Sequence, residues 1–164
     1  MATQIITVSD FLAASAPYPA GDDVFLTDGQ AAIQAMTPAQ VANLAAFNVD
    51  WIDSTDGVLV LSAAQAANIG AVAFSAGDYV VISDTGANLA ALSAAEITAL
   101  DAAGLSGITA SDGALSLTAA QYLALGQIAL EVSNTVTLAD TGANIAALTP
   151  VEIAGLESKN FDAI

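Results

Sequence analysis

The sequence predicts an α/β repeat protein: a short solenoid of about three 56-residue units, each with two capped helices and short parallel strands. Two observations predict this class. Helix-boundary signals recur along the chain at a fixed spacing, and short aliphatic runs that end in Asp- and Gly-containing turns separate the predicted helices. None of these segments can bury its apolar face alone, so we expect successive units to stack.

The clearest helix signal begins at Ser93. Ser93 and Glu96 are spaced as a capping box, in which each side chain accepts a hydrogen bond from the other residue's backbone N–H. Leu92 and Ile97 flank this box as a hydrophobic staple would, and Gly104 tolerates the left-handed conformation that closes a helix. Together these signals define one short helix from its first residue to its last.

The same signals recur along the chain in two alternating types. Caps of the first type repeat with the 56-residue period, and one cap of a second type lies between each pair of them, so a shorter and a longer step alternate. A Gln or Glu follows each cap three positions later. The predicted N-caps are Thr37, Ser62, Ser93, Thr118 and Thr149. The predicted closing residues are Asn48, Gly70, Gly104, Gly126 and Asn160.

Short strands are predicted between these helices, bounded by turn-forming residues. The Asp56-Gly57 pair predicts a tight turn between two strands, and Gly77-Asp78 predicts another turn. Stacking of equivalent strands would give parallel ladders with the helices on another face, whereas the alternative fold is an ordinary doubly wound sheet. In chain order the strands are expected at residues 24–26, 49–53, 58–61, 72–74 and 79–83, with equivalents in the next unit and a last strand at 161–164.

The repeat pattern also predicts the domain organisation. Ile6–Ser9 align with Leu59–Ser62. From Pro19 onward, the sequence aligns with the next unit at an offset that is three residues larger. We therefore expect three residues to be missing where Pro17 and Pro19 break the first helix early. The expected single domain, residues 1–164, comprises a degenerate N-terminal capping coil (1–23), a first repeat (24–79), a second repeat (80–135) and half of a third (136–164).

The charge balance argues against several partners. The chain has 17 acidic residues and one basic residue, Lys159, with no Arg, His or Cys, which gives a net charge of −16. Nucleic acids and anionic membranes are recognised through clustered Lys and Arg, so we expect neither as a partner. The sequence has no uninterrupted apolar run of about 18 residues, so we do not expect insertion into a membrane. The N-terminus lacks the basic and apolar segments of a secretory signal. We expect Lys159, at the end of the last helix, to complement the helix dipole.

Few residues could perform enzymatic chemistry. Without His, Cys and Arg, the chain lacks the usual general base, thiol nucleophile and anion clamp. One close carboxylate pair, Asp53 with Asp56, could act in glycoside hydrolysis, and a second pair is Asp22 with Asp23. Both pairs lie at predicted turns, where Asp is favoured because its side chain bonds to local backbone. We therefore expect no enzymatic activity.

A possible metal site is predicted by the run Asp-Thr-Gly-Ala-Asn, which occurs twice. Oxygens of these side chains are hard ligands that suit calcium, especially outside a cell. The other interpretation is that each Asp caps the helical turn that follows and each Asn bonds to local backbone, which is favoured because Asp28 in the first repeat lacks the Thr and Asn. The candidate calcium ligands are Asp84, Thr85, Asn88, Asp140, Thr141 and Asn144.

The phrases SDTGANLAALSAAEITAL (83–100) and LADTGANIAALTPVEIAGL (138–156) resemble Ala-rich repeats of large surface and secreted proteins of alphaproteobacteria. Such proteins often carry calcium-binding RTX segments and leave the cell by type I secretion, although the glycine-rich RTX nonapeptide is absent here. The resemblance implies an extracellular or cell-surface location, reached without an N-terminal signal peptide. Residues 161–164 look like the end of some type I secretion signals, but the repeat alignment explains them as a strand.

These observations favour a non-enzymatic structural repeat module: a spacer, an adhesin segment, or a self-assembling unit of a surface layer or filament. The alternative function is a calcium-dependent extracellular binding module. The expected assembly edge consists of Phe161, Ala163 and Ile164, because this apolar strand has no polar layer after it. The expected partners are a second copy or further repeats of the same chain, and no cofactor is expected apart from calcium in the alternative.

Overall fold

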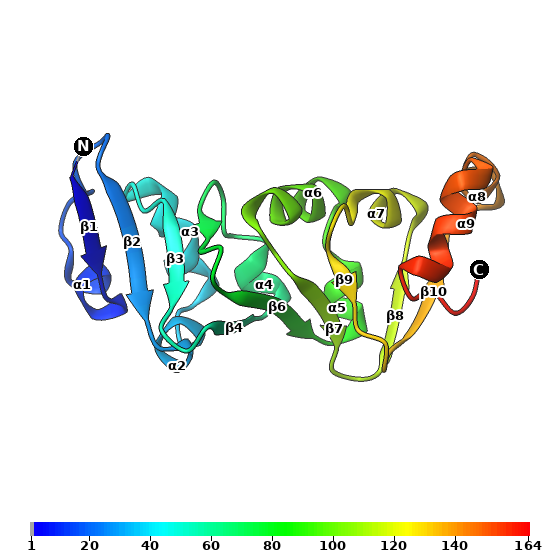
Figure 1. Cartoon of the computed structure of the whole chain (residues 1–164), viewed down its shortest axis with the longest axis horizontal. Helices are drawn as coiled ribbons and strands as arrows, with labels where there is room; N and C mark the ends of the chain where they lie inside the picture. Colours follow the sequence, from blue (N-terminus) through cyan, green and yellow to red (C-terminus); the bar gives the residue numbers. More distant parts are fainter. Residues whose placement is uncertain (1) are drawn as a thin grey trace.

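A computed structural model describes residues 2–164 as a mixed α/β protein with parallel strands and short helices. Figure 1 shows an elongated molecule whose two chain termini lie at opposite ends of the long axis. The helices are α1 (Val8–Ala13), α2 (Gln30–Gln34), α3 (Pro38–Ala46), α4 (Ala63–Ala66), α5 (Gly86–Ala90), α6 (Ala94–Ala103), α7 (Ala119–Ala124), α8 (Gly142–Ala146) and α9 (Pro150–Ser158). The strands are β1 (Thr3–Ile6), β2 (Asp23–Asp28), β3 (Trp51–Ser54), β4 (Val58–Leu61), β5 (Ala73–Phe74), β6 (Tyr79–Asp84), β7 (Gly107–Ala110), β8 (Ala114–Leu117), β9 (Ala129–Leu130) and β10 (Thr135–Leu138).

In chain order the elements form six layers, which progress along the long axis with overlap, so that β9 of layer 6 lies beside β7 of layer 5 (Figure 1). Odd layers carry one short helix: β1-α1 in layer 1, β3-β4-α4 in layer 3 and β7-β8-α7 in layer 5. Even layers carry two helices: β2-α2-α3 in layer 2, β5-β6-α5-α6 in layer 4 and β9-β10-α8-α9 in layer 6. Equivalent elements of layers 3 and 5, and of layers 4 and 6, all begin one repeat period apart.

The strands form three parallel sheets that overlap along the chain, with the orders β1-β2-β3-β5, β4-β6-β7-β9 and β8-β10. Layers 3 and 4 each contribute one strand to the first sheet and one to the second. Layers 5 and 6 do the same for the second and third sheets. Within each of layers 3 to 6, the chain therefore passes from one sheet to the next between its two strands. It does so at a turn such as that of Gly57, whose φ is 68°.

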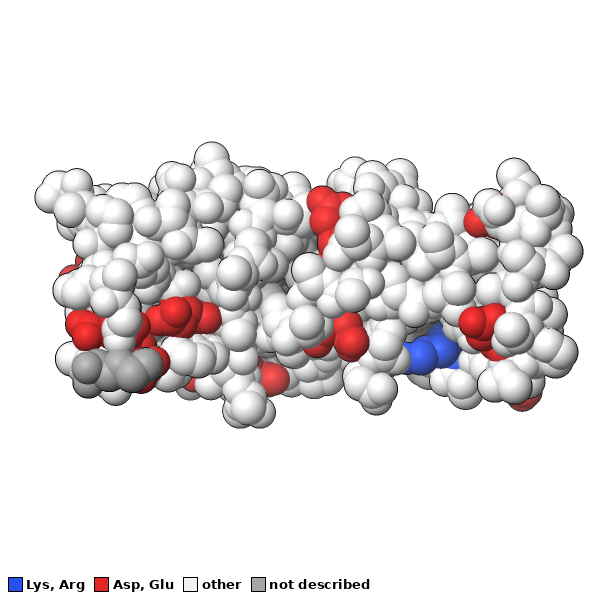
Figure 2. All heavy atoms as spheres, turned by 90° about the horizontal axis from the view of Figure 1, so that it is seen from above, with Lys and Arg blue, Asp and Glu red and all other residues white. Residues whose placement is uncertain are grey.

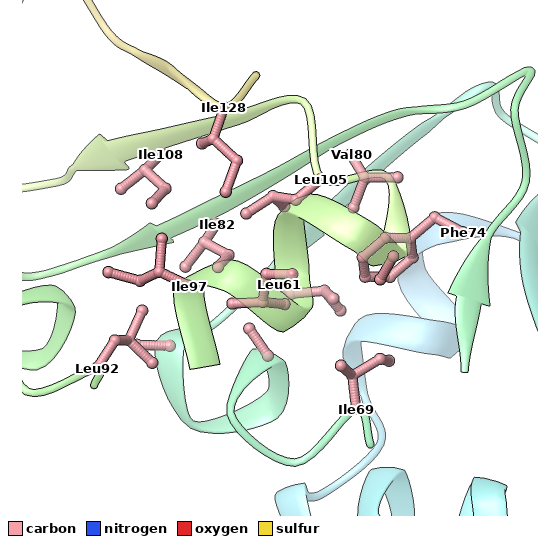
Figure 3. Close-up of a cluster of buried hydrophobic side chains, with 14 of the residues drawn as sticks. Leu61, Ile69, Phe74, Val80, Ile82, Leu92, Ile97, Leu105, Ile108 and Ile128 are labelled. Atoms are coloured by element: carbon pink, nitrogen blue, oxygen red, sulfur yellow. The ribbon is translucent and has the colours of Figure 1, made fainter. Parts of the chain in front are cut away.

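Aliphatic side chains from every layer form one continuous core between the strands and the helices. In β6, Val80 and Ile82 are buried while Tyr79 is exposed, which is the alternation expected of a strand with one covered face. Figure 3 shows this region, where Ile82 and Ile108 from neighbouring strands lie with Ile97 of α6. The core thus joins successive layers and not only the elements within one layer.

The predicted helix caps are confirmed. Each of the five predicted N-caps forms a reciprocal capping box with the residue three positions later. Each predicted closing residue has a positive φ, from 48° at Gly126 to 96° at Gly104. The largest difference is in α4, which ends at Ala66, well before Gly70. These boundaries are set by contacts within a few residues, so the sequence signals suffice to locate them.

Layer 1 differs from the prediction. Thr7 is the N-cap of α1 and forms a capping box with Asp10, whereas the alignment placed Ser9 at this position. The reason is that Thr7 has a carboxylate three positions later and Ser9 does not. Paired residues of β1 and β2 are 20 apart and those of β4 and β6 are 21 apart, so one residue is missing here and the expected loss of three is wrong. Helix α1 ends at Ala13, before either proline.

The end of the chain is also less regular than predicted. Of residues 161–164, only Ala163 makes a parallel bridge, with Thr137 of β10. The third sheet therefore has two strands and one isolated bridge at its edge.

Candidate functional site

The first group of predicted calcium ligands lies where β6 leads into α5. Oδ1 of Asp84 accepts hydrogen bonds from the backbone N of Thr85 (2.8 Å) and from Nδ2 of Asn88 (2.7 Å). Its Oδ2 accepts a hydrogen bond from the backbone N of Ala63, the first residue of α4 in the preceding layer (3.0 Å). Thr85, and not Asp84, is the N-cap of α5, because its Oγ1 accepts a hydrogen bond from the backbone N of Asn88 (3.3 Å). Asp84 therefore joins two layers.

The second group has the same geometry. Oδ1 of Asp140 accepts hydrogen bonds from the backbone N of Thr141 and Nδ2 of Asn144, both at 2.7 Å. Its Oδ2 accepts one from the backbone N of Ala119, at the start of α7 (3.0 Å). Asp28 likewise accepts a hydrogen bond from the first residue of α1 (3.1 Å), although it has no Thr and Asn beside it. The part of this motif shared by all three repeats is thus the interlayer hydrogen bond.

Hydrogen bonding keeps both carboxyl groups ionised. Burial raises the pKa of Asp84, but the hydrogen bonds that it accepts, first of all from Asn88, outweigh burial and hold its pKa below the ordinary value of 3.8. The pKa of Asp140 is lowered first by its hydrogen bond from Asn144 and then by those from backbone N–H groups. Both carboxylates are charged at neutral pH and are directed at N–H donors.

These six residues therefore make structural hydrogen bonds, but not the predicted ones. Thr85 and Thr141, and not the Asp residues, cap the turns that follow, and each Asn donates to the Asp side chain and not to backbone. Calcium binding stays a prediction. Calcium takes about six to eight oxygen ligands, usually including several carboxylates. Among residues 2–164, no three Asp, Glu, His or Cys side chains gather closely enough to hold a metal ion. A calcium ion at Asp84 or Asp140 would have to compete with the N–H groups whose hydrogen bonds these carboxylates already accept.

The predicted carboxylate pairs also contain structural acceptors. Asp56 Oδ2 accepts a hydrogen bond from the backbone N of Gln30 in the preceding layer (2.6 Å). Asp22 accepts hydrogen bonds from the backbone N of Ala2 (2.9 Å) and from Nε2 of Gln4 (2.8 Å). In each pair, one carboxylate is thus engaged in holding backbone.

Interlayer acceptors of this kind extend along the whole chain, and sequence reasoning missed them. At one repeated position, Asp50 accepts a hydrogen bond from the backbone N of Val24 (2.9 Å). One and two repeat periods later, Ser106 and Asp162 do the same for equivalent strand residues. The signal that could have revealed them is a polar side chain recurring just before a strand. Within residues 2–164, every acidic side chain accepts a hydrogen bond from a backbone N–H except Asp23, Asp53, Glu131 and Glu157.

The surface reflects this distribution. On the face shown in Figure 2, acidic side chains lie in small separate groups and do not merge into one patch. Lys159 follows α9 as its C-cap, and its ammonium group donates hydrogen bonds to the carbonyl oxygens of Gly126 (2.6 Å) and Ile128 (3.1 Å). It therefore binds the chain between layers 5 and 6, in addition to lying at the helix end where we expected it.

The three residues of the predicted assembly edge have different environments. The Phe161 ring packs edge-on against Tyr122, with 5.3 Å between ring centroids. The carbonyl oxygen of Ala163 accepts a hydrogen bond from the backbone N of Leu138 (2.9 Å). Ile164 is 63% exposed. Phe161 is thus half-buried, whereas Ala163 and Ile164 are both exposed.

Comparison of the chain with protein-family models, with curated proteins and with solved structures finds no match. Across residues 2–164, the helices are too short or too polar for any of them to cross a membrane. The geometry itself is therefore the basis for a functional proposal.

Proposed function

We propose that this chain is a non-enzymatic structural repeat module, a short solenoid in which 56-residue units stack in register. Its units are the capping coil 1–23, the repeats 24–79 and 80–135, and the half repeat 136–164. The module acts as a spacer, an adhesin segment or an assembly unit. Its location is extracellular or at the cell surface, in line with the resemblance to repeats of secreted proteins.

One observation carries this proposal: the acidic side chains mostly bind backbone N–H groups between layers. A carboxylate that accepts such hydrogen bonds is held in place and ionised, and it is poorly suited to transfer protons at neutral pH. The arrangement at Asp84 is repeated at Asp140, as expected of a device that builds each unit. A catalytic site would be expected at one place and not at every repeat.

Calcium titration separates this function from the alternative, a calcium-dependent binding module. Isothermal titration of calcium into protein stripped by a chelator should show no binding tighter than roughly millimolar, the weak extracellular range. The matched control is the double variant Asp84→Asn/Asp140→Asn, which keeps one acceptor oxygen at each site and removes its charge. Micromolar binding that disappears in this variant would favour the binding module.

A further inference from the structure

One apolar position of the long even-layer helix is exposed in layer 6, although the equivalent side chains in layers 2 and 4 are buried. Ile97 of α6 is 0% exposed and Val41 of α3 is 2% exposed, whereas Ile153, the equivalent residue of α9, is 45% exposed. In the earlier layers, the helix of the next odd layer packs against the long helix of the even layer: α4 contacts α3, and α7 contacts α6. Helix α9 has the same apolar residues without such a neighbour among residues 2–164.

The odd layers also bind the preceding layer through one glutamine. Nε2 of Gln121 donates hydrogen bonds to the carbonyl oxygens of Ala90 (2.9 Å) and Leu92 (2.6 Å). Gln65 makes the same two contacts one repeat earlier. In layer 6 the equivalent carbonyl groups, one repeat period beyond those bound by Gln121, belong to Ala146 and Leu148.

A second contact joins the strand that follows each odd-layer helix to the first strand of that odd layer. The N–H groups of Ala129 and Glu131 donate to the carbonyl oxygens of Ser106 (3.1 Å) and Ile108 (3.1 Å). The N–H groups one repeat earlier, at residues 73 and 75, donate in the same way at 2.8 Å. The equivalent acceptors at the end of the third sheet are the backbone oxygens of Asp162 and Ile164.

We propose that the exposed face formed by α8, α9 and residues 161–164 is a docking site for one kind of partner: the helix of an odd layer with the chain that follows it. This inference rests on the proposed stacking of units. The partner supplies a short helix with a Ser/Thr-x-x-Gln capping box, whose glutamine amide binds the carbonyl oxygens of Ala146 and Leu148 while its apolar side covers Ile153. The chain after that helix supplies two N–H groups, two positions apart, for Asp162 and Ile164.

Layer 1 of an unmodified second copy does not match this description, because all three donor residues are replaced. Asp10 stands at the position of Gln65 and Gln121 and has no side-chain N–H to donate. Pro17 and Pro19 stand at the positions of residues 73 and 75 and lack the backbone N–H. Head-to-tail pairing of two copies through these three donors is therefore blocked.

The test restores these donors. The triple variant Asp10→Gln/Pro17→Ala/Pro19→Ser carries, at each site, the residue of the next repeat. In sedimentation velocity with chelator present and salt added to screen the negative charge, we expect the sedimentation coefficient of the variant to rise with concentration. The unmodified protein should show no head-to-tail association. Adding Ile153→Asp to the triple variant should abolish the association, because the substitution alters only the receiving face.

A folded triple variant that remains monomeric would overturn the proposal, as would assembly that Ile153→Asp leaves unchanged. If circular dichroism shows that the triple variant does not fold, a second chain decides the matter: a copy of residues 109–131 appended after Ile164. Its unfolding midpoint should exceed that of the same chain carrying Asp in place of the appended glutamine equivalent to Gln121. Equal midpoints would then refute the docking site. Neither result depends on the calcium titration. Failure of the docking site can therefore be distinguished from failure of the proposed function.

Discussion

At the scale of single residues, the carboxylates of this chain act chiefly as acceptors for backbone N–H groups. Asp84 shows how one side chain does this for two layers, because its two oxygens bind the start of α5 and the start of α4. The acidic composition is thus largely explained by architecture. The acidic composition therefore does not require a partner that binds carboxylates, or a catalytic role.

These contacts predict that the protein loses stability in acid. Hydrogen bonds lower the pKa of Glu96 and Glu152 below 4.5, and those of Asp84 and Asp140 below 3.8. Because the unfolded chain keeps the ordinary values, it binds more protons than the folded protein over this range. The stabilisation is complete above those values and decreases as the pH falls through them toward the lower folded-state pKa values. Urea unfolding at a series of pH values measures this change.

The variant Asp84→Asn serves as the control for the pH dependence, since it removes one titrating group and keeps an acceptor oxygen. Its free energy of unfolding should depend less on pH than that of the unmodified protein. Relief of repulsion among the 17 acidic groups acts in the opposite direction. A free energy of unfolding that stays constant or rises on acidification would show that this repulsion outweighs the hydrogen bonds.

At the scale of secondary-structure elements, two local devices define each helix: a capping box at its start and, for several helices, a left-handed residue at or shortly after its end. Helix α6 has both, with Ser93 and Glu96 at one end and Gly104 at the other. The odd helices α4 and α7 add a third device, a glutamine that belongs to the capping box and also reaches the preceding layer. The same side chain therefore sets the helix start and the distance between layers.

The local devices predict unequal costs. Ser93→Ala should lower the free energy of unfolding by about 1 kcal/mol, as at other N-caps. Gly104→Val should cost more, because Gly104 has a φ of 96°, which strains a β-branched residue. Gly77→Val is the matched control, since the φ of Gly77 lies outside the left-handed region and its surroundings are open. Chemical unfolding of the three variants checks this order, and equal costs for the two glycine sites would contradict it.

The interlayer glutamine predicts a second asymmetry. Gln121→Glu keeps the acceptor of the capping box but removes the amide donor and places a carboxylate against the carbonyl oxygens of Ala90 and Leu92. We expect a loss of about 1–3 kcal/mol in the free energy of unfolding. Gln40→Glu at the same helix position should have little effect, because Gln40 bonds only within its own capping box. Comparable losses in the two variants would rule out the interlayer role of the glutamine amide.

At the scale of the whole molecule, layers of two types alternate, and each sheet spans parts of several layers. Odd and even layers are not interchangeable, because the glutamine lies on odd layers and its carbonyl acceptors lie on even ones. The smallest unit that can be added without disturbing these contacts is therefore a pair of layers. This is the 56-residue unit of the sequence.

Lengthening the chain tests that conclusion. A second copy of residues 80–135, inserted after residue 135, should fold and increase the maximum dimension measured by small-angle X-ray scattering, without lowering the unfolding midpoint. A duplicate of residues 108–135 adds half a period and puts odd elements where even ones belong. We expect this control to unfold at a lower temperature. Similar midpoints for the two insertions would contradict alternation of the layers.

The sequence by itself determined the period, the five capping boxes, the closing residues and the α/β class with parallel strands. These features depend on hydrogen bonds within a few residues, such as that between Ser93 and Glu96, or on the alternation of side chains along a strand. The structural role of Asp84 and Asp140 was among the interpretations, although the helix that each one caps was not the predicted one.

Only the tertiary structure decided how the layers fit together. The partner of Asp84 lies 21 residues away, that of Asp50 lies 26 away and those of Gln121 lie 29 and 31 away. Such contacts depend on the register in which layers stack, and a small shift, as in the alignment of layer 1, changes every one of them. Local propensity carries no information about that register. It is fixed by burial of the shared core and by the hydrogen bonds that each layer offers the next.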